Sequence, residues 1–371
     1  MTLFERIRAK GPKRILALDG GGIRGIITLE ILARIEGLLR GRSGLSDDFV
    51  LADYFDYIAG TSTGAIISTA LSLGMTVSDI RSFYLEGRKE MFEKASVYRR
   101  FHYKYEDRKL SAKLKEVFGA DTTLGSDKLK TVLLLMMRNA TTDSPWPITN
   151  NPFAKYNQKE RSDCNLNIPL WQLVRASTAA PTYFPPEVVQ VGEVKFVFVD
   201  GGVSPYNNPA FQAFLMATVE PYNLNWLAGE NQLLLVSIGT GTVPRADIHL
   251  QPGKMNVLYT SVSLPMALLN ATLNEQDFLC RVFGKCVVGD LLDREIGDLI
   301  DKQGPVSPKL FTYLRYNADL TAEGLDKLGL ADIQPEKIQQ LDSIEHTADL
   351  QRVGQAIAQQ KVKIQDFGDF L

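Results

Sequence analysis

Cysteine and histidine are scarce in this 371-residue chain, which contains three of each. Cys164, Cys280 and Cys286 form neither a CxxC pair nor a Cys/His metal spacing, and their odd number disfavours a disulfide framework. We therefore expect free thiols and no metal site. Apolar runs fall far short of the roughly 20 residues of a membrane-spanning helix, and the segment Met1–Arg14 lacks the apolar core of a secretory signal. These absences predict a cytoplasmic protein.

A strong excess of charge of either sign is also missing, since 41 basic side chains face 43 acidic ones and the net charge is −2. Such a balance gives no general attraction to nucleic acid, so we expect no nucleic-acid partner. A hydrophobic share of 45% with ordinary glycine and proline contents excludes the disordered and collagen-like classes. The 29 glycines become informative through their positions, because three of them stand together near the start of the chain.

Short apolar runs alternate with helical patterns over most of the chain. The strand-like runs are Arg14–Leu18, Tyr54–Ala59, Lys130–Arg138, Lys195–Val199 and Leu233–Ile238. The helical patterns cover Ile26–Leu39, Ala65–Leu73, Ser78–Phe92, Pro169–Thr178 and Pro209–Thr218. This alternation predicts an α/β fold with a mainly parallel sheet that is covered on both faces.

The strand signal fades beyond Pro244. The remaining patterns are a helix at Leu264–Phe283, a strand at Lys309–Tyr316, and polar helices within Pro335–Lys361 that carry a narrow stripe of Leu350, Val353 and Ile357. We expect the stripe to pack back on the core. The predicted domains are an N-terminal extension at 1–13, one α/β domain at 14–245 and a mostly helical C-terminal extension at 246–371.

The sequence DGGGIRG at Asp19–Gly25 stands between a predicted strand and a predicted helix. Its glycines match the dinucleotide fingerprint GxGxxG, so a nucleotide-binding module is one interpretation. That fingerprint needs an acidic residue about 20 positions further on, after a second strand. Asp47 and Asp48 stand at this distance, but Gly41–Ser46 before them is polar and turn-like. The second strand that would support the interpretation is therefore missing.

The same glycine cluster also suits the stabilisation of a transient negative charge. Consecutive glycines allow several backbone N–H groups to converge at a helix N-terminus, where the helix dipole favours an anion. Such a point can hold the oxyanion that forms during acyl transfer. A plain tight turn, the third interpretation, would not need three adjacent glycines followed by Arg24.

The sequence GTSTG at Gly60–Gly64 matches the nucleophile elbow G-x-S-x-G. A predicted strand precedes it and a predicted helix follows it, which is the context that this motif requires. The strained turn lifts the serine clear of the sheet, and the flanking Gly60 and Gly64 avoid side-chain clashes. We therefore predict that Ser62 is a nucleophile.

A nucleophilic serine needs a base. None of the three histidines, His102, His249 and His346, follows a predicted core strand, which disfavours a Ser-His-Asp triad. Asp200 directly follows the strand Lys195–Val199, at a position where parallel sheets form ligand crevices. Although a carboxylate is a weak base in water, one bonded directly to a serine in a dry cleft can take its proton. The alternative role for Asp200 is that of a turn or helix cap.

Taken together, these motifs resemble the patatin-like phospholipase family over roughly Arg14–Thr242. The resemblance rests on DGGGIRG, GTSTG and VDGG (Val199–Gly202), and on RASTAAPTYFPP (Arg175–Pro186), SPYNNPA (Ser204–Ala210) and SIGTG (Ser237–Gly241). Six motifs in the family's order are far more specific than any one of them.

The resemblance implies a three-layer α/β/α sandwich and metal-independent hydrolysis of acyl esters in membrane lipids, without a cofactor. Ser62 would be the nucleophile and Asp200 the general base. The oxyanion hole would be formed by Gly20, Gly21 and Gly22 with Arg24 nearby. The implied partners are a membrane phospholipid or another acyl lipid, with transient peripheral contact between the protein and the membrane.

Two further segments suggest contacts with a lipid. Tyr183 and Phe184 lie in a stretch rich in proline and aromatic residues, which would line an acyl cleft or form a rigid packed loop. The segment Glu86–Leu110 mixes basic and aromatic residues. It would act as a lid, an interfacial contact or an anion-binding cap, or form a plain solvated helix with one packed side.

Two alternatives keep the same active site. An acyltransferase would pass the acyl group to an alcohol instead of water. Some bacterial members of the family resemble antiphage effectors that a cyclic nucleotide activates, so a small-molecule activator is a further expected partner. The basic aromatic segment and the C-terminal extension are compatible with such regulation.

Overall fold

The computed structural model describes residues 2–42, 48–91, 103–105, 107–243 and 257–371. A nine-stranded sheet crosses the molecule in the order β5-β6-β3-β2-β1-β7-β9-β8, and β4 pairs with β3 beside this path. The strands are β1 (Lys13–Leu18), β2 (Tyr57–Thr61), β3 (Val132–Asn139), β4 (Ser144–Thr149), β5 (Glu187–Val191), β6 (Val194–Asp200), β7 (Leu233–Ile238), β8 (Lys285–Val288) and β9 (Thr312–Tyr316).

Parallel pairing dominates the middle of the sheet. β1 pairs in parallel with β2 and β7, β2 with β3, and β9 with both β7 and β8. Antiparallel pairing is confined to β4, β5 and β6 at the β3 side. Because the carboxyl ends of parallel strands share one edge, the loops after β1 and β2 meet there.

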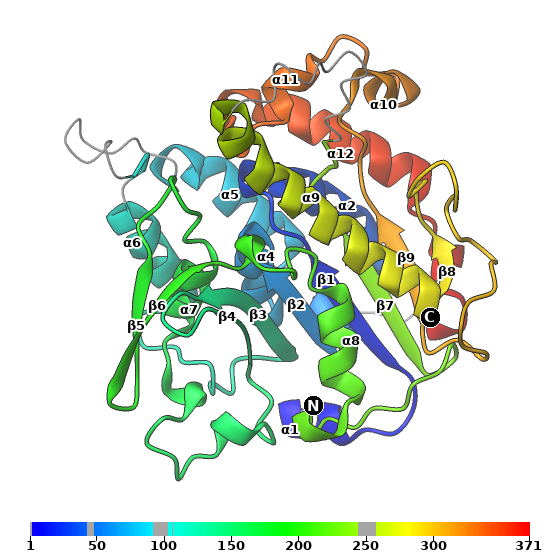
Figure 1. The fold of residues 1–371 in the computed structure, drawn as a ribbon. Helices are drawn as coiled ribbons and strands as arrows, with labels where there is room; N and C mark the ends of the chain where they lie inside the picture. The colour runs from blue at the N-terminus through cyan, green and yellow to red at the C-terminus, as the bar shows by residue number, and fades with distance from the viewer. Residues whose placement is uncertain (1, 43–47, 92–102, 106, 244–256) are drawn as a thin grey trace.

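Helices cover both faces of the sheet (Figure 1). The helices are α1 (Leu3–Arg8), α2 (Gly25–Arg40), α3 (Leu51–Tyr54), α4 (Thr63–Ser72), α5 (Val77–Met91), α6 (Asp107–Phe118), α7 (Leu170–Ser177), α8 (Ala210–Thr218), α9 (Val257–Phe283), α10 (Ala322–Lys327), α11 (Pro335–Ile338) and α12 (Thr347–Lys361). Alternate residues of β1 enter two cores: Leu16 and Leu18 pack with α2 and α12, whereas Ile15 and Ala17 pack with α8. The predicted three-layer α/β/α sandwich with a mainly parallel sheet is confirmed.

The C-terminal residues are built into this architecture. Leu350, Val353 and Ile357 of α12 are fully buried, as the apolar stripe predicts. Gly354 lies so close to α2 that a Cβ would contact Ile27 and Glu30. β8 and β9 also come from this part of the chain and extend the same sheet. The region is mostly helical, and it contributes to both the sheet and one outer layer.

The sequence pattern misplaces or misses several elements. The strand expected at Tyr54–Ala59 begins only at Tyr57, because Leu51–Tyr54 forms α3. β4 was not expected, since two prolines interrupt its sequence SPWPIT and it pairs only with β3. β5 was not expected either; it is a partly exposed edge strand. Within the described residues, no helix is long and apolar enough to cross a membrane.

Candidate active site

Ser62 lies in the tight turn between β2 and α4, at the carboxyl edge of the sheet. Its backbone dihedral angles are φ 54° and ψ −120°, a conformation that is strained for a residue with a side chain. The flanking glycines are required by close backbone approach: a Cβ on Gly60 would collide with the carbonyl of Gly64, and one on Gly64 with the carbonyl of Leu18. This geometry is that of a nucleophile elbow.

Asp200 ends β6 and lies beside this elbow. The Ser62 hydroxyl donates a hydrogen bond of 2.6 Å to Asp200 Oδ2, and the Gly202 amide donates one of 2.7 Å to Asp200 Oδ1. Burial raises the pKa of Asp200 to about 6, although both hydrogen bonds and the charge of Arg175 favour the ionised form. The structure thus brings together the two side chains that the motifs single out.

Of the three histidines, His346 is the one within the described residues, and its Nδ1 lies 3.4 Å from Asp349 on α12. His102 and His249 lie outside the described residues. The contact partner of Ser62 Oγ is the carboxylate of Asp200. The site therefore has the groups of a serine–carboxylate dyad.

The glycine loop after β1 runs next to the serine, since a Cβ on Gly20 would lie 3.2 Å from the Cβ of Ser62. The N–H groups of the loop are not equivalent. The amide of Gly20 donates to the carbonyl of Asn207 at 3.1 Å, and that of Ile23 donates to the carbonyl of Leu341 at 2.9 Å. The amides of Gly21 and Gly22 have no acceptor among the described residues. The expected contribution of Gly20 thus needs correction, because its N–H is already bonded in this structure.

Arg24 is buried at the end of this loop, in the short 3₁₀ helix η1 (Gly22–Arg24). Its Nε donates a long hydrogen bond of 3.4 Å to the carbonyl of Gly21. Burial lowers the pKa of Arg24 to about 10, while Asp19 and Tyr183 favour its charged form. The described contact therefore places Arg24 as a support of the loop.

Residues that are remote in the sequence hold the glycine loop in place. Arg315 of β9 forms a buried bidentate ion pair with Asp19, at 3.0 and 2.6 Å, and donates to Ser237 of β7 at 2.7 Å. The hydroxyl of Thr240 donates to the carbonyl of Gly20 at 2.9 Å. Sequence reasoning missed Arg315, because its partner lies 296 positions away.

The elbow has its own support from α7. The Ser62 amide donates to Ser177 Oγ at 2.9 Å, and Ser177 Oγ donates to the carbonyl of Met136 on β3 at 2.6 Å. Arg175 is fully buried and donates to the carbonyl of Pro185 at 2.8 Å. The motif RASTAAPTYFPP contains Arg175, Ser177 and Pro185, but the sequence did not assign them a role.

The two acyl-cleft candidates have different surroundings. Phe184 is 6% exposed and packs in the core, with the guanidinium of Arg175 over its ring at 5.4 Å. This is the packing of a rigid loop, the alternative left open above. Tyr183 is half-buried and stacks on Tyr105 with 6.2 Å between ring centroids. Of Glu86–Leu110, residues 92–102 and 106 lie outside the described residues.

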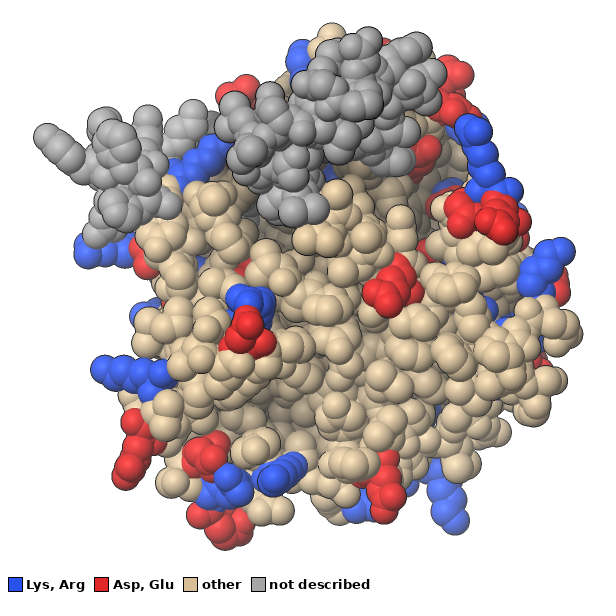
Figure 2. Space-filling view, viewed as in Figure 1, with Lys and Arg blue, Asp and Glu red and all other residues tan. Residues whose placement is uncertain are grey.

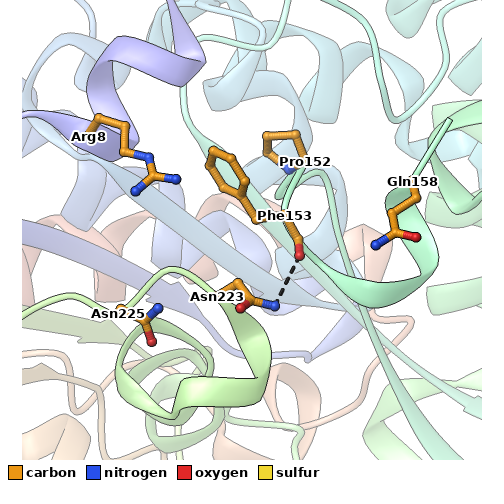
Figure 3. A pocket seen from close by; sticks show the side chains of 6 residues that line it. All are labelled: Arg8, Pro152, Phe153, Gln158, Asn223 and Asn225. Carbon is orange, nitrogen blue, oxygen red and sulfur yellow. Dashed lines mark hydrogen bonds between the residues drawn. The ribbon is translucent and has the colours of Figure 1, made fainter.

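A polar cavity of about 410 Å³ lies at the end of the sheet where the central parallel strands begin, opposite the end that carries Ser62 (Figure 3). It is lined by α1, by the segment after β4 and by the loop before β7, through Arg8, Pro152, Phe153, Gln158, Asn223 and Asn225. These elements meet at the amino ends of β1 and β7, away from Ser62. Among the described residues, no group of three His, Cys, Asp or Glu side chains is arranged to hold a metal ion.

The predicted dinucleotide fingerprint is incomplete in the structure. Asp48 is followed by α3 and precedes β2, whereas the fingerprint needs its acidic residue after the second strand. Asp47 lies outside the described residues. Within the described residues, the structure therefore does not provide the strand before Asp48 that the nucleotide-binding interpretation of the glycine loop needs.

Comparison with known proteins assigns the chain to a family. The family model for patatin-like phospholipase matches residues 16–214, and the chain belongs to this family. Patatin-T5 of Solanum tuberosum is 30% identical over 254 residues, which cover 63% of this chain and 61% of the relative. The 85/88 kDa calcium-independent phospholipase A2 of Mus musculus is 31% identical over 263 residues, which cover 66% of this chain and 29% of the relative.

The chain thus matches less than two thirds of the length of these relatives. Among solved structures, VipD from Legionella pneumophila aligns with 92% of this chain and 67% of its own, at 14% sequence identity and a TM-score of 0.36. A score this low supports no functional argument.

Proposed function

We propose that this protein is a lipid acyl hydrolase that cleaves fatty-acyl esters through Ser62 and Asp200. The observation that carries the proposal is the 2.6 Å hydrogen bond from Ser62 Oγ to Asp200 Oδ2 on a strained elbow. Membership in the patatin-like phospholipase family supports the same chemistry. In this proposal Ser62 is the nucleophile, Asp200 is the base, and backbone amides of the glycine loop are the oxyanion donors.

In the acylation step, Ser62 Oγ attacks the ester carbonyl carbon while Asp200 Oδ2 takes the hydroxyl proton. The negative charge moves to the former carbonyl oxygen, toward the amides of Gly21 and Gly22 and the N-terminus of α4. When the tetrahedral intermediate collapses, the bond to the leaving alcohol breaks and Asp200 returns the proton to that oxygen. The product is an acyl ester on Ser62.

The deacylation step repeats this sequence with water. Asp200 takes a proton from the attacking water, the same amides hold the second oxyanion, and collapse breaks the bond to Ser62 Oγ. Asp200 then protonates Ser62, which releases the fatty acid and restores the dyad. Each oxyanion donor in a site of this kind contributes roughly 2.7–4 kcal/mol of transition-state stabilisation.

The proposed substrate is a membrane phospholipid or another acyl lipid, reached through transient peripheral contact from the cytoplasm. Figure 2 shows few charged side chains in the middle of the face that carries α8 and α9, and more around its rim. Val203, which follows Asp200 closely, and Leu268 and Phe278 of α9 expose 49%, 57% and 39% of their surface. A weakly charged face with exposed apolar side chains suits a lipid surface.

The direct test is fatty-acid release from phospholipid vesicles and from a p-nitrophenyl acyl ester without added calcium. We expect activity in the wild type and its loss in Ser62→Ala and Asp200→Asn. Ser144→Ala at a partly exposed position and Asp332→Asn at an exposed position are the matched controls and should stay active. Full activity in either dyad variant would contradict the proposed mechanism. Ester products formed with added glycerol would identify an acyltransferase.

Control by a cyclic nucleotide stays a prediction, because residues 92–102 and 106 of the basic aromatic segment on which it rests lie outside the described residues. The measurement is fatty-acid release with and without a panel of cyclic dinucleotides. An increased rate with one of them would identify an activator, and an unchanged rate across the panel would remove this class of ligand.

A further inference from the structure

The segment between α11 and α12 reaches back to the glycine loop. The carbonyl of Leu341 accepts the hydrogen bond from the amide of Ile23 at 2.9 Å. Gly22 has a φ of +59°, and a Cβ there would collide with the same carbonyl. The position of Leu341 is therefore coupled to the peptide that carries the amides of Gly21 and Gly22, which have no acceptor among the described residues.

The next residue, Asp342, binds the chain segment at 103–105. Its side chain is 7% exposed and accepts hydrogen bonds from Lys104 Nζ and, at 2.5 Å, from the hydroxyl of Tyr105. Burial disfavours the ionised carboxylate, but these two donors hold the pKa of Asp342 below its usual value. A buried carboxylate with two donors is a specific anchor, because either partner alone would leave part of its charge unsatisfied.

Tyr105 in turn contacts residues 182–184. The amides of Lys104 and Tyr105 donate to the carbonyls of Thr182 and Tyr183, at 3.0 and 2.9 Å. The ring of Tyr105 lies 6.2 Å from that of Tyr183 and 5.6 Å from that of Phe184. The Asp342 carboxylate, next to Leu341, thus links the glycine loop to residues 182–184.

The segment 179–184 also contacts Asp200, the proposed base. The amide of Asp200 donates to the carbonyl of Ala179 at 3.0 Å, four residues before Tyr183. A closed series of contacts therefore joins the oxyanion loop, Asp342, Tyr105, the segment 179–184 and Asp200. Four segments that are remote in the sequence meet in it: the glycine loop, residues 103–105, residues 179–200 and residues 341–342.

We propose that Asp342 and Tyr105 are positioning residues, which fix the oxyanion amides relative to the dyad and to the segment 179–184. The proposal rests on the proposed hydrolase function. It explains why a polar C-terminal segment without motif residues carries a nearly buried carboxylate. Displacement of the donors by a fraction of an ångström weakens stabilisation of the transition state more than binding of the ester, so the rate constant should fall while KM changes little.

The test compares Asp342→Ala, Asp342→Asn and Tyr105→Phe. Asp342→Asn keeps an acceptor for Tyr105 but loses the charge that faces Lys104. Tyr105→Phe keeps the aromatic ring but loses the hydroxyl that donates to Asp342. The control is Asp332→Ala, because Asp332 pairs with Arg352 on the surface. kcat is measured per active serine, counted by titration with a fluorophosphonate, so that partial unfolding does not lower it.

We expect kcat to fall about tenfold in Asp342→Ala and less in the two milder variants, with KM within about twofold, as for a lost transition-state interaction. Asp332→Ala should match the wild type. An unchanged kcat per active serine in all three variants would overturn the proposal, as would a loss confined to KM. If Asp342→Ala does not fold, the milder pair decides the outcome.

A second readout does not depend on activity. Hydrogen–deuterium exchange of the peptide that covers Gly20–Arg24 should accelerate in Asp342→Ala and Tyr105→Phe but not in Asp332→Ala. An inactive wild type would remove the hydrolase proposal, whereas unchanged exchange would remove the coupling between Asp342 and the loop. The two failures are therefore distinguishable.

Discussion

At the scale of single residues, the central question is how a carboxylate replaces histidine as the base. Asp200 is 4% exposed and bonded directly to Ser62. Loss of water raises its pKa from 3.8 to about 6, whereas its two hydrogen bonds and Arg175 oppose the shift. A base with this pKa stays ionised at neutral pH and takes a proton more readily than an exposed aspartate would.

The first prediction concerns pH. We expect kcat/KM to rise with pH, to level off above about pH 6, and to fall about tenfold for each unit below that value, because only ionised Asp200 can take the proton. The measurement is initial-rate fatty-acid release across this range, with circular dichroism to verify that the chain stays folded. A rate that stays constant through the acidic range in folded protein would rule out Asp200 as the base.

The second prediction concerns stability. The folded pKa of Asp200 lies above its ordinary value, so the native state binds more protons between the two pKa values and stability falls as pH rises through this window. Asp200→Asn removes the titration, and the shift corresponds to a gain of up to about 3 kcal/mol at neutral pH. Urea unfolding of both proteins at about pH 4 and pH 7 tests this. Equal or lower stability of the variant at neutral pH would contradict it.

At the scale of elements, the turns after β1 and β2 combine backbone strain with close packing. Gly21 lies against Thr240, and Gly64 against the carbonyl of Leu18, so that neither position has room for a Cβ. The strain at Ser62 persists because both turns are held from several sides, by Ser177, Asn207 and Thr240.

The third prediction compares two glycine substitutions. Gly21→Ala should lower kcat by at least about 100-fold, because its Cβ would displace the loop that carries an oxyanion donor. Gly37→Ala is the matched control, since nothing lies within 4 Å of a Cβ at this position in α2. It should keep full activity and gain about 0.5–1 kcal/mol of stability. Ester hydrolysis and thermal unfolding provide both values, and an active Gly21→Ala protein would refute the assignment.

The sequence predicted some elements better than others for physical reasons. The fully buried central strands give continuous apolar runs, so Leu233–Ile238 was predicted with the observed bounds. The sequence pattern does not predict β4, because prolines are unfavourable within a strand and β4 contains two of them. Ser62, Asp200 and the glycine loop stand in local motifs that impose a turn, and the sequence indicated them. Arg315 and Asp342 act over long separations and leave no local signal.

At the scale of the whole molecule, the C-terminal region completes the site. β9 supplies Arg315, which neutralises Asp19 at the start of the glycine loop, and the segment after α11 supplies Leu341 and Asp342. The region 246–371 is therefore more than a cover over the sheet. We expect the conformation of the oxyanion loop to depend on it.

The fourth prediction concerns the ion pair through which β9 holds the start of this loop. Arg315→Leu leaves the buried carboxylate of Asp19 without its partner and should cost about 3–5 kcal/mol of stability. The double variant Asp19→Asn with Arg315→Leu removes both charges and should recover part of the loss. Arg352→Leu breaks an exposed pair and should change stability by less than about 1 kcal/mol. Chemical unfolding measures these three variants and Asp19→Asn alone, and additive effects of the two buried substitutions would argue against coupling.

The most direct measurement of the central claim is the site and rate of covalent labelling by a long-chain alkyl fluorophosphonate. Intact-protein and peptide mass spectrometry should find one adduct per chain, on the peptide that contains Ser62. Labelling should be absent in Ser62→Ala and slower by at least about 1000-fold in Asp200→Asn, as expected for a nucleophile that depends on its base. An adduct on another residue, or an equal labelling rate in Asp200→Asn, would contradict the account.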